Sequence, residues 1–186
     1  MNRMVKKRQT LFVAVAFIII SYLLFRFRTY TYETTVVIPK VHPSNVWEFV
    51  ADFSNMKYLN PTLVDFNILS DTGNYQHWKY STEYTEHLSH WPYLKNTALA
   101  HYNVKTGPHN VYYIISNHNT CMLEGLLCLE SESEFKFSLN DGVYGARCTE
   151  TVRYQCPFLF APFCRREVKY QRASIFHNLM IHFDKK

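Results

Sequence analysis

The chain has 186 residues, with 20 Lys and Arg, 15 Asp and Glu, and a formal net charge of +5. Six of the basic residues and no acid fall in residues 1–28, which leaves 14 bases, 15 acids and a net charge of −1 in residues 29–186. A nucleic-acid-binding domain concentrates Lys and Arg on its folded part, so this class is set aside. The length fits one domain with a substantial core.

An apolar segment near the N-terminus predicts a membrane anchor. Residues 11–25 carry no charge, and at about 1.5 Å rise per residue a helix over residues 10–27 with snorkelling arginines bridges a thin bilayer. Basic residues flank the run, namely Arg3, Lys6, Lys7 and Arg8 before it and Arg26 and Arg28 after it. We expect a basic flank at residues 1–9, a single transmembrane anchor at residues 10–27 and a folded domain at residues 31–186.

Two other interpretations of this segment stay open. A cleaved signal peptide is disfavoured because residues 26–32 offer no cleavage site of the small-x-small kind. A mitochondrial presequence fits the absence of any acid before Glu33 but not the length of the apolar run. We expect a single-pass protein of the endoplasmic reticulum or another endomembrane, with a mitochondrial membrane as the alternative.

The side of the membrane on which the domain lies also stays open. Four Lys or Arg before the apolar run against two after it favour a cytosolic N-terminus and a lumenal domain. The sequence Asn60-Pro61-Thr62 has proline in the middle and so accepts no glycan, and this absence favours a cytosolic domain.

The start of the domain predicts a strand and two short helices. Residues 33–39 are rich in β-branched side chains, and the strand should end at Pro39 because proline cannot donate to a ladder. Residues 43–53 place apolar side chains at three- and four-residue spacing, which is typical of an amphipathic helix. A second helical turn is expected at residues 55–59.

These segments, from Val36 to Pro61, resemble the opening of the START-like superfamily, also called SRPBCC or helix-grip, which includes polyketide cyclase-like and lipid-transport proteins. The resemblance implies an α+β fold with a seven-stranded curved antiparallel sheet, two short helices and a long C-terminal helix held by the sheet. It also implies a cavity that binds a lipid or another hydrophobic small molecule.

The strand signals downstream agree with seven strands. We expect strands at residues 62–69, 76–90, 96–105, 110–118, 122–139 with a break allowed, and 144–156. Turn residues occur at residues 71–74, 106–109 and 140–142. No connection after residue 61 is long enough for a crossover helix, so the sheet should be antiparallel.

Alternation within two strands predicts an apolar inner face that carries one carboxylate on each strand. The even positions from Trp78 hold aromatic residues and Glu86, and the even positions of residues 146–156 hold apolar residues and Glu150. We expect a ligand cavity lined by Trp47, Tyr58, Trp78, Tyr80, Tyr84, Glu86, Tyr113, Phe137, Glu150, Tyr154, Ile175 and Leu179.

If the protein is an enzyme, Glu86 and Glu150 are the candidate catalytic residues. Desolvation raises the pKa of a carboxylate, which suits it to general acid or base chemistry. The interpretation that we favour is a hydrogen-bond anchor for a tyrosine or a ligand head group, or a buried pair with an arginine. No nucleophile with a neighbouring base, phosphate loop or cofactor fingerprint occurs in the sequence, so we expect no cofactor.

A long helix is predicted from about Pro162 to the end of the domain. Arg165, Arg166, Lys169 and Arg172 mark one side of it, which we interpret as a solvated face. Contact with anionic lipid head groups is the alternative.

The cysteines and histidines predict no metal site. Cys121, Cys128, Cys148, Cys156 and Cys164 show no Cys-x-x-Cys spacing, and His87 and His90 would point to opposite faces of a strand. Buried free thiols are the favoured interpretation of the cysteines. A lumenal domain would instead allow two disulfides and one free thiol.

The expected function is binding of a lipid or other hydrophobic small molecule at a membrane, with transfer or presentation as extensions. The expected partners are that ligand and the membrane, through residues 10–27, and no nucleic acid. The alternatives are a cyclase- or hydratase-like enzyme that uses Glu86 or Glu150, and a non-catalytic interaction domain at a membrane.

Overall fold

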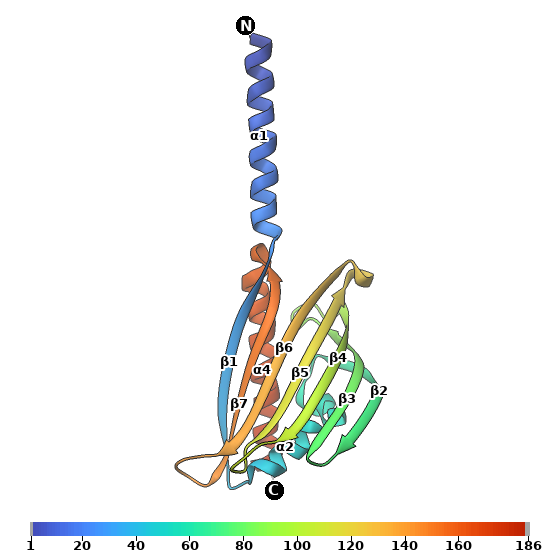
Figure 1. The fold of residues 1–186 in the computed structure, drawn as a ribbon, viewed down its shortest axis with the longest axis vertical. Helices are drawn as coiled ribbons and strands as arrows, with labels where there is room; N and C mark the ends of the chain where they lie inside the picture. The colour runs from blue at the N-terminus through green and yellow to red at the C-terminus, as the bar shows by residue number, and fades with distance from the viewer. Residues whose placement is uncertain (1, 185–186) are drawn as a thin grey trace.

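The computed structural model describes residues 2–184 as a curved sheet packed on helices, with one separate helix at the N-terminus (Figure 1). Helix α1 (Asn2–Phe25) projects from one end of the domain, and α4 (Ala161–Asp184) runs along the domain to its opposite end. Within α1, Lys7–Phe25 is long and apolar enough to cross a membrane. The expected basic flank and the expected domain each extend beyond the described residues, by residue 1 and residues 185–186.

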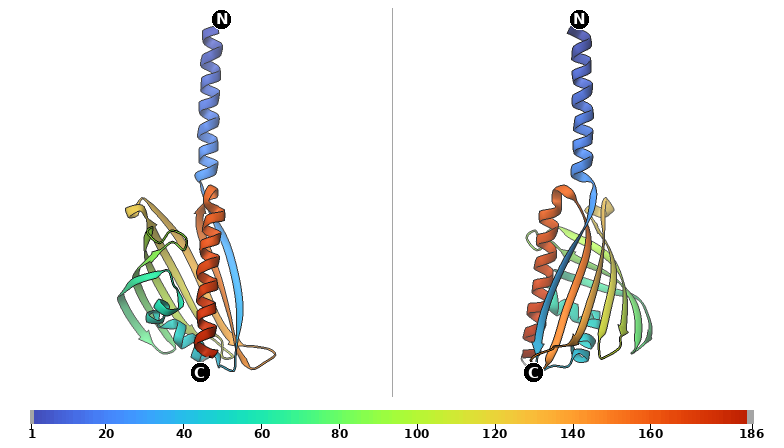
Figure 2. Two further views of the ribbon diagram at one scale, coloured as in Figure 1. Left: turned by 180° about the vertical axis from the view of Figure 1, so that it is seen from behind. Right: turned by 60° about the vertical axis from the view of Figure 1, so that its left-hand side comes forward.

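Seven antiparallel strands form one sheet in the order β1-β7-β6-β5-β4-β3-β2. The strands are β1 (Phe27–Pro39), β2 (Leu63–Asn74), β3 (His77–His87), β4 (Lys95–Thr106), β5 (Tyr112–Met122), β6 (Leu127–Leu139) and β7 (Gly145–Pro157). Two short helices, α2 (Pro43–Ala51) and α3 (Met56–Leu59), lie with α4 on the inner side of the sheet (Figure 2). The expected helix-grip arrangement is confirmed.

The first strand is longer than expected. It begins at Phe27 and not at Glu33, and it pairs with β7 from Phe27 opposite Pro157 to Pro39 opposite Gly145. Residues 29–32 alternate Thr and Tyr, which are good strand formers, and the pairing satisfies their backbone groups. Because α1 ends at Phe25, a single residue separates helix from strand.

One predicted turn is wrong and one predicted break is confirmed. Strand β2 continues through residues 71–74, and the chain reverses after Asn74, whose Oδ1 accepts hydrogen bonds from the backbone N–H groups of Gln76 and His77. Gly73 shapes the strand end, since it lies at φ +119° and a Cβ there would lie 2.2 Å from the His77 carbonyl oxygen. The break allowed within residues 122–139 is a 3-10 turn at Leu123–Gly125.

The core lies between the inner face of the sheet and the helices. Its fully buried members include Val46 of α2, Phe137 of β6 and Leu179 of α4. Two hydrogen bonds fasten α2 to the sheet: the Trp47 indole N–H donates to the Tyr113 carbonyl at 3.2 Å, and the Tyr80 hydroxyl donates to the Ala51 carbonyl at 2.9 Å. These contacts hold the helix over the strands that carry the site.

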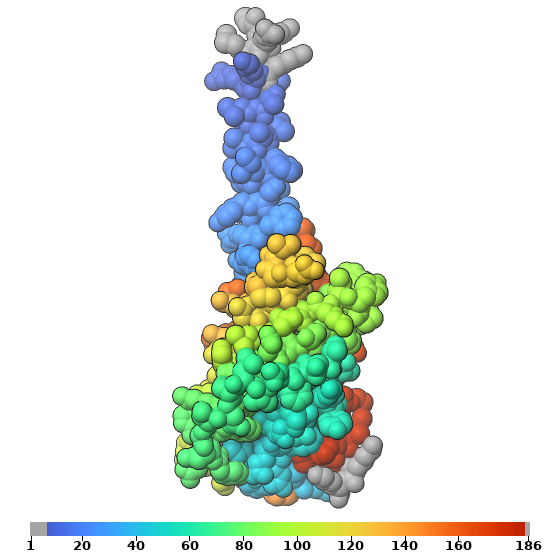
Figure 3. Space-filling view, turned by 90° about the vertical axis from the view of Figure 1, so that its right-hand side faces the viewer, coloured from blue at the N-terminus to red at the C-terminus, as the bar shows by residue number. Residues whose placement is uncertain are grey.

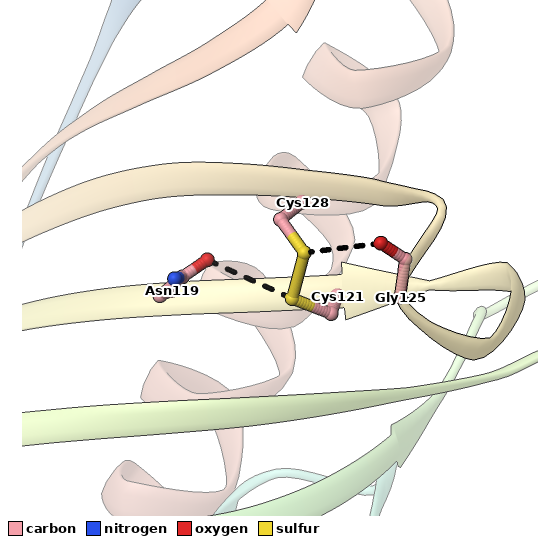
Figure 4. Close-up of a disulfide and its surroundings, with 4 residues drawn as sticks. All are labelled: Asn119, Cys121, Gly125 and Cys128. Carbon is pink, nitrogen blue, oxygen red and sulfur yellow. Dashed lines mark hydrogen bonds between the residues drawn. A yellow bond between two sulfur atoms is a disulfide. The ribbon is translucent and has the colours of Figure 1, made fainter.

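Two disulfides overturn the interpretation that the cysteines are free thiols. Cys121 and Cys128 are bonded across the turn between β5 and β6, because the hairpin register places them directly opposite each other (Figure 4). Cys156 and Cys164 join the end of β7 to the first turn of α4. Cys148 alone is free and buried, as expected, and burial raises its pKa to about 12.

Candidate functional site

An interior cavity of about 60 Å³ lies on the inner face of the sheet. Strands β3 to β7, the segment around α3, and α4 all contribute to its lining. Aromatic, polar and charged side chains share this lining, which consists of Val50, Phe53, Met56, Asn60, Leu63, Tyr84, Glu86, Tyr102, Ile114, Ser116, His118, Ser133, Phe135, Glu150, Arg172 and Ile175. A space of this size holds a few water molecules or a small polar group, since small-molecule sites measure about 300–1,000 Å³.

A buried ion pair forms one side of the cavity. Arg172 Nη1 donates to Glu150 Oε1 at 2.5 Å, and the Ser133 hydroxyl donates to the same oxygen at 2.7 Å. Burial lowers the pKa of Arg172, but the charges of Glu150 and Glu86 outweigh this effect and raise it. The expectation that Arg172 lies on a solvated face is therefore wrong, and the buried pair with an arginine, foreseen for Glu150, is what the structure shows.

The ion pair has unused hydrogen-bonding capacity. Glu150 Oε2 and Arg172 Nε are both buried and have no hydrogen-bond partner among the described residues. Glu150 is only 1% exposed, and buried polar atoms in proteins are nearly always hydrogen-bonded. Both residues line the cavity, so the pair carries an unpaired donor and an unpaired acceptor close to it.

Glu86 forms a second polar cluster at the cavity. Its Oε1 accepts a hydrogen bond from Asn60 Nδ2 at 2.7 Å and its Oε2 accepts one from Gln171 Nε2 at 3.3 Å. Burial raises the pKa of Glu86, although Arg172 and the two amides act against this effect. Asn60 Oδ1 also accepts from the backbone N–H and hydroxyl of Thr62, so the cluster fastens the chain after α3 to β3 and α4.

A neutral histidine completes the lining. His118 Nδ1 lies 2.8 Å from the Tyr84 hydroxyl and Nε2 lies 2.8 Å from the Ser116 hydroxyl. Burial, helped by the charge of Arg172, lowers the pKa of His118 to about 3. The imidazole is therefore uncharged at neutral pH and serves as a hydrogen-bonding group between a tyrosine and a serine.

The arrangement suits binding better than nucleophilic catalysis. Ser116 neighbours His118, but an imidazole with a pKa of about 3 is a weak base for activating a hydroxyl at neutral pH. The Cys148 thiol, with its pKa raised to about 12, stays protonated. Within residues 2–184, no group of three or more His, Cys, Asp or Glu side chains is placed to hold a metal ion.

The structure brings together four of the cavity residues predicted from the sequence: Tyr84, Glu86, Glu150 and Ile175. Tyr80, Phe137 and Leu179 are buried in the adjoining core, and Tyr154 belongs to a second core cluster, where it stacks on Tyr30. Trp47 and Trp78 line a separate groove. Tyr58 is 78% exposed, and Tyr113 contributes its carbonyl to Trp47.

Sequence reasoning missed Arg172, His118 and Asn60 as lining residues. Ile114, Ser116 and His118 alternate along β5, so the parity that revealed Glu86 and Glu150 would also have indicated His118. Asn60 and Arg172 give no such local signal, because their partners lie 26 and 22 residues away in the sequence.

The sequence matches no model of a known protein family and no curated protein. Similar solved structures include a conserved protein from Geobacillus kaustophilus, with 15% identity, TM-score 0.59, and coverage of 84% of this chain and 96% of that one. The human StarD13 lipid transfer and protein localization domain has 14% identity, TM-score 0.58, and coverage of 82% and 76%. A START superfamily protein from Mycobacterium smegmatis has 12% identity, TM-score 0.52, and coverage of 86% and 97%.

The fold is START-like. The expectation drawn from residues 36–61 is thus confirmed for the architecture of the domain. At these identities the similarity concerns the fold alone, so function must be argued from the site.

Proposed function

We propose that the domain binds a lipid or another hydrophobic small molecule at a membrane, with the polar part of the ligand in the interior cavity. The observation that carries the proposal is the buried Glu150–Arg172 pair, whose residues line the cavity and which leaves one acceptor and one donor atom without a partner. Burying two charges is costly, and a ligand group that bonds to both atoms would offset part of that cost. The remainder of the ligand would be bound by burial of apolar surface, at about 25 cal/mol per Å².

The volume of the cavity limits which part of a ligand can fit inside it. About 60 Å³ accommodates a head group and not an acyl chain, so uptake requires the lining to open or the chain to lie elsewhere. The segment from Phe53 to Asn60 is the candidate moving part, because it is built from short helical turns and supplies three lining residues, Phe53, Met56 and Asn60. Names of two structural neighbours, a START superfamily protein and a lipid transfer domain, support a hydrophobic ligand.

The second part of the proposal is that α1 is a single transmembrane anchor and that the domain lies on the non-cytosolic side. Its support is the pair of disulfides, since disulfides persist in oxidising compartments and are rare in the cytosol. The excess of basic residues before the apolar run of residues 11–25 favours the same orientation. An endomembrane lumen or the cell exterior satisfies both observations.

An enzyme is the second candidate, and Glu86 is the observation that favours it. Burial raises the pKa of Glu86, as a general acid or base requires, and its side chain lines the cavity. Its two amide partners give it a structural role as well. Replacement of Glu86 by Gln separates the two functions, because a carrier would keep its ligand and an enzyme would lose turnover.

Photo-crosslinking of the full chain in lipid nanodiscs tests the binding proposal. The probe is phosphatidylcholine with a diazirine next to the head group. We expect labelled peptides from the inner faces of β5, β6 and β7, around His118, Ser133 and Glu150. Labelling confined to α1 would contradict the proposal.

A further inference from the structure

A second pocket, of about 350 Å³, lies at the end of the domain from which α1 projects. It shares no lining residue with the interior cavity. Leucine and aromatic side chains dominate its lining, among them Leu88, Trp91, Leu94, Leu127, Leu129 and Phe163, while Lys95 supplies a charge. Its volume lies within the range of about 300–1,000 Å³ that is typical of small-molecule sites.

The walls of this pocket are fixed by covalent and polar contacts. Trp91 stacks on Phe163 with ring centroids 5.4 Å apart, and Glu167 of α4 accepts hydrogen bonds from the backbone N–H and hydroxyl of Ser89, both at 2.8 Å. Cys164, a lining residue, is bonded to Cys156. The Cys121–Cys128 disulfide (Figure 4) ties together the two strands whose neighbouring residues Met122 and Leu127 line the pocket. These contacts hold the walls of the pocket in place.

The surface around the pocket is apolar and exposed. Leu126 is 86% exposed, Tyr93 78% and Leu123 61%, all in the loops at this end of the domain. The loop of residues 123–126, coloured gold, lies at the end of the domain from which α1 projects (Figures 1 and 3). Exposed apolar side chains gathered at one end of a domain mark an interaction surface.

The end of α1 is continuous with this surface. The Phe25 ring of α1 lies 6.3 Å from the ring of Phe160, which lines the pocket. Only Arg26 separates the end of α1 from the start of β1 at Phe27. With so short a linker, this end of the domain must stay close to a bilayer that α1 crosses. A soluble protein partner would have to displace lipid to reach the same surface.

Two basic side chains lie at this end of the domain, where lipid head groups would lie, and one of them, Arg166, borders the pocket through Phe163. The Arg28 guanidinium lies 4.6 Å from the centre of the Phe158 ring, and that of Arg166 lies 5.3 Å from the centre of the Phe163 ring. Both arginines are exposed at this end of the domain. Their charges are complementary to phosphate groups at the membrane surface.

We propose that this second pocket binds an acyl chain of a lipid from the bilayer that α1 crosses, a proposal that rests on the proposed anchor. Leu88 follows Glu86 of the interior cavity by two residues, and Leu129 and Ser133 lie on the same face of β6. The chain-binding pocket thus adjoins the polar cavity, on the side that faces the membrane. It supplies the apolar volume that the interior cavity lacks.

The test is photo-crosslinking of the full chain in phosphatidylcholine vesicles with a lipid whose diazirine sits at the end of one acyl chain. We expect label on Leu129 and Phe163, inside the pocket. Leu129→Trp, which fills the pocket, should lose most of the Phe163 label. Leu139→Trp, the same change at the far end of the same strand, should keep it.

The other outcomes separate this inference from the proposed function. Label only on α1 and the exposed residues Leu126 and Tyr93 would show surface contact alone and would overturn the pocket. The acyl-chain probe could label the pocket while the head-group probe gives no label around His118. That result would support the pocket and contradict the interior site. Failure of the chain to insert into vesicles would overturn the anchor, and with it this inference. The set of residues labelled in the wild-type protein distinguishes these outcomes even if the Leu129→Trp variant fails to fold.

Discussion

Arg172 of α4 and Glu150 of β7 connect the long helix to the sheet through a buried ion pair, with Nη1 and Oε1 2.5 Å apart. The Arg172 side chain is 20% exposed and that of Glu150 is 1% exposed, so the pair is largely removed from water. Such a pair contributes little to net stability, because desolvation of the charges opposes their attraction.

Arg172→Met should lower the free energy of unfolding by about 3–5 kcal/mol, because it leaves the Glu150 carboxylate buried without an opposite charge, with only the Ser133 hydroxyl bonded to it. The double variant Arg172→Met with Glu150→Gln removes both charges and should lose less than the single variant. Urea denaturation of the full chain in mild detergent measures both. Arg166→Met, on an exposed part of the same helix, should change stability by only about 0.5 kcal/mol and serves as the control.

Acidification should destabilise the protein through His118. Its pKa falls from an ordinary value near 6.5 to about 3 on folding, so between these values the unfolded chain binds a proton that the folded protein does not. The free energy of unfolding should therefore decrease by up to about 1.4 kcal/mol for each unit that the pH falls below about 6.5. His118→Gln should flatten this dependence, and a variant with the slope of the wild type would refute the assignment.

Glu86 should change the pH dependence in the opposite direction. Burial raises its pKa, so its contribution to stability is lost as the pH rises through the folded-state value. Comparison of Glu86→Gln with His118→Gln in the same pH series therefore separates the two groups. Each variant should alter only its own part of the curve.

Glu86→Gln should leave lipid binding intact and shift only the preference among head groups if the domain is a carrier. Gln retains an acceptor for the Asn60 amide, so folding should be preserved. Retained folding, checked by circular dichroism, with complete loss of turnover of an identified substrate would instead establish the enzyme. The measurement is competition between lipids of different head groups for the purified full chain.

Thiol labelling should show a single free cysteine. Maleimide should modify only Cys148, and only after denaturation, until a reductant opens the two disulfides. Replacing Cys156 and Cys164 together by Ser opens a link between residues eight apart and should cost about 2–3 kcal/mol. Labelling of all five cysteines without reductant would contradict both the disulfides and the non-cytosolic location.

The sequence predicted the sheet and its inner face well, because both follow from local patterns. The alternation around Glu86 and Glu150 placed both carboxylates inside, and a break within residues 122–139 was allowed, although its position at Leu123–Gly125 was not specified. The pairing of residues 27–32 with β7 could not be predicted locally, because the register depends on a strand more than 100 residues away.

The site was less predictable for a related reason. Arg172 lies among other basic residues of α4 and has the sequence signature of a solvated helix face, yet the curvature of the sheet brings Glu150 against it. Tyr58 is the opposite case: it was expected inside the cavity and is exposed. Helix α3 is a single turn, and it buries Leu59 and not the tyrosine. Tertiary packing determines whether Arg172 and Tyr58 are buried or exposed, and neither residue spacing nor residue type in the sequence predicts that packing.

Native mass spectrometry of the full chain, released from membranes in mild detergent and followed by lipid extraction, tests the central claim most directly. The account predicts a hydrophobic adduct in a one-to-one ratio that survives detergent exchange and is weakened in the Arg172→Met/Glu150→Gln double variant. A folded wild-type protein that carries no adduct, and that takes up none from a panel of lipids, would contradict it.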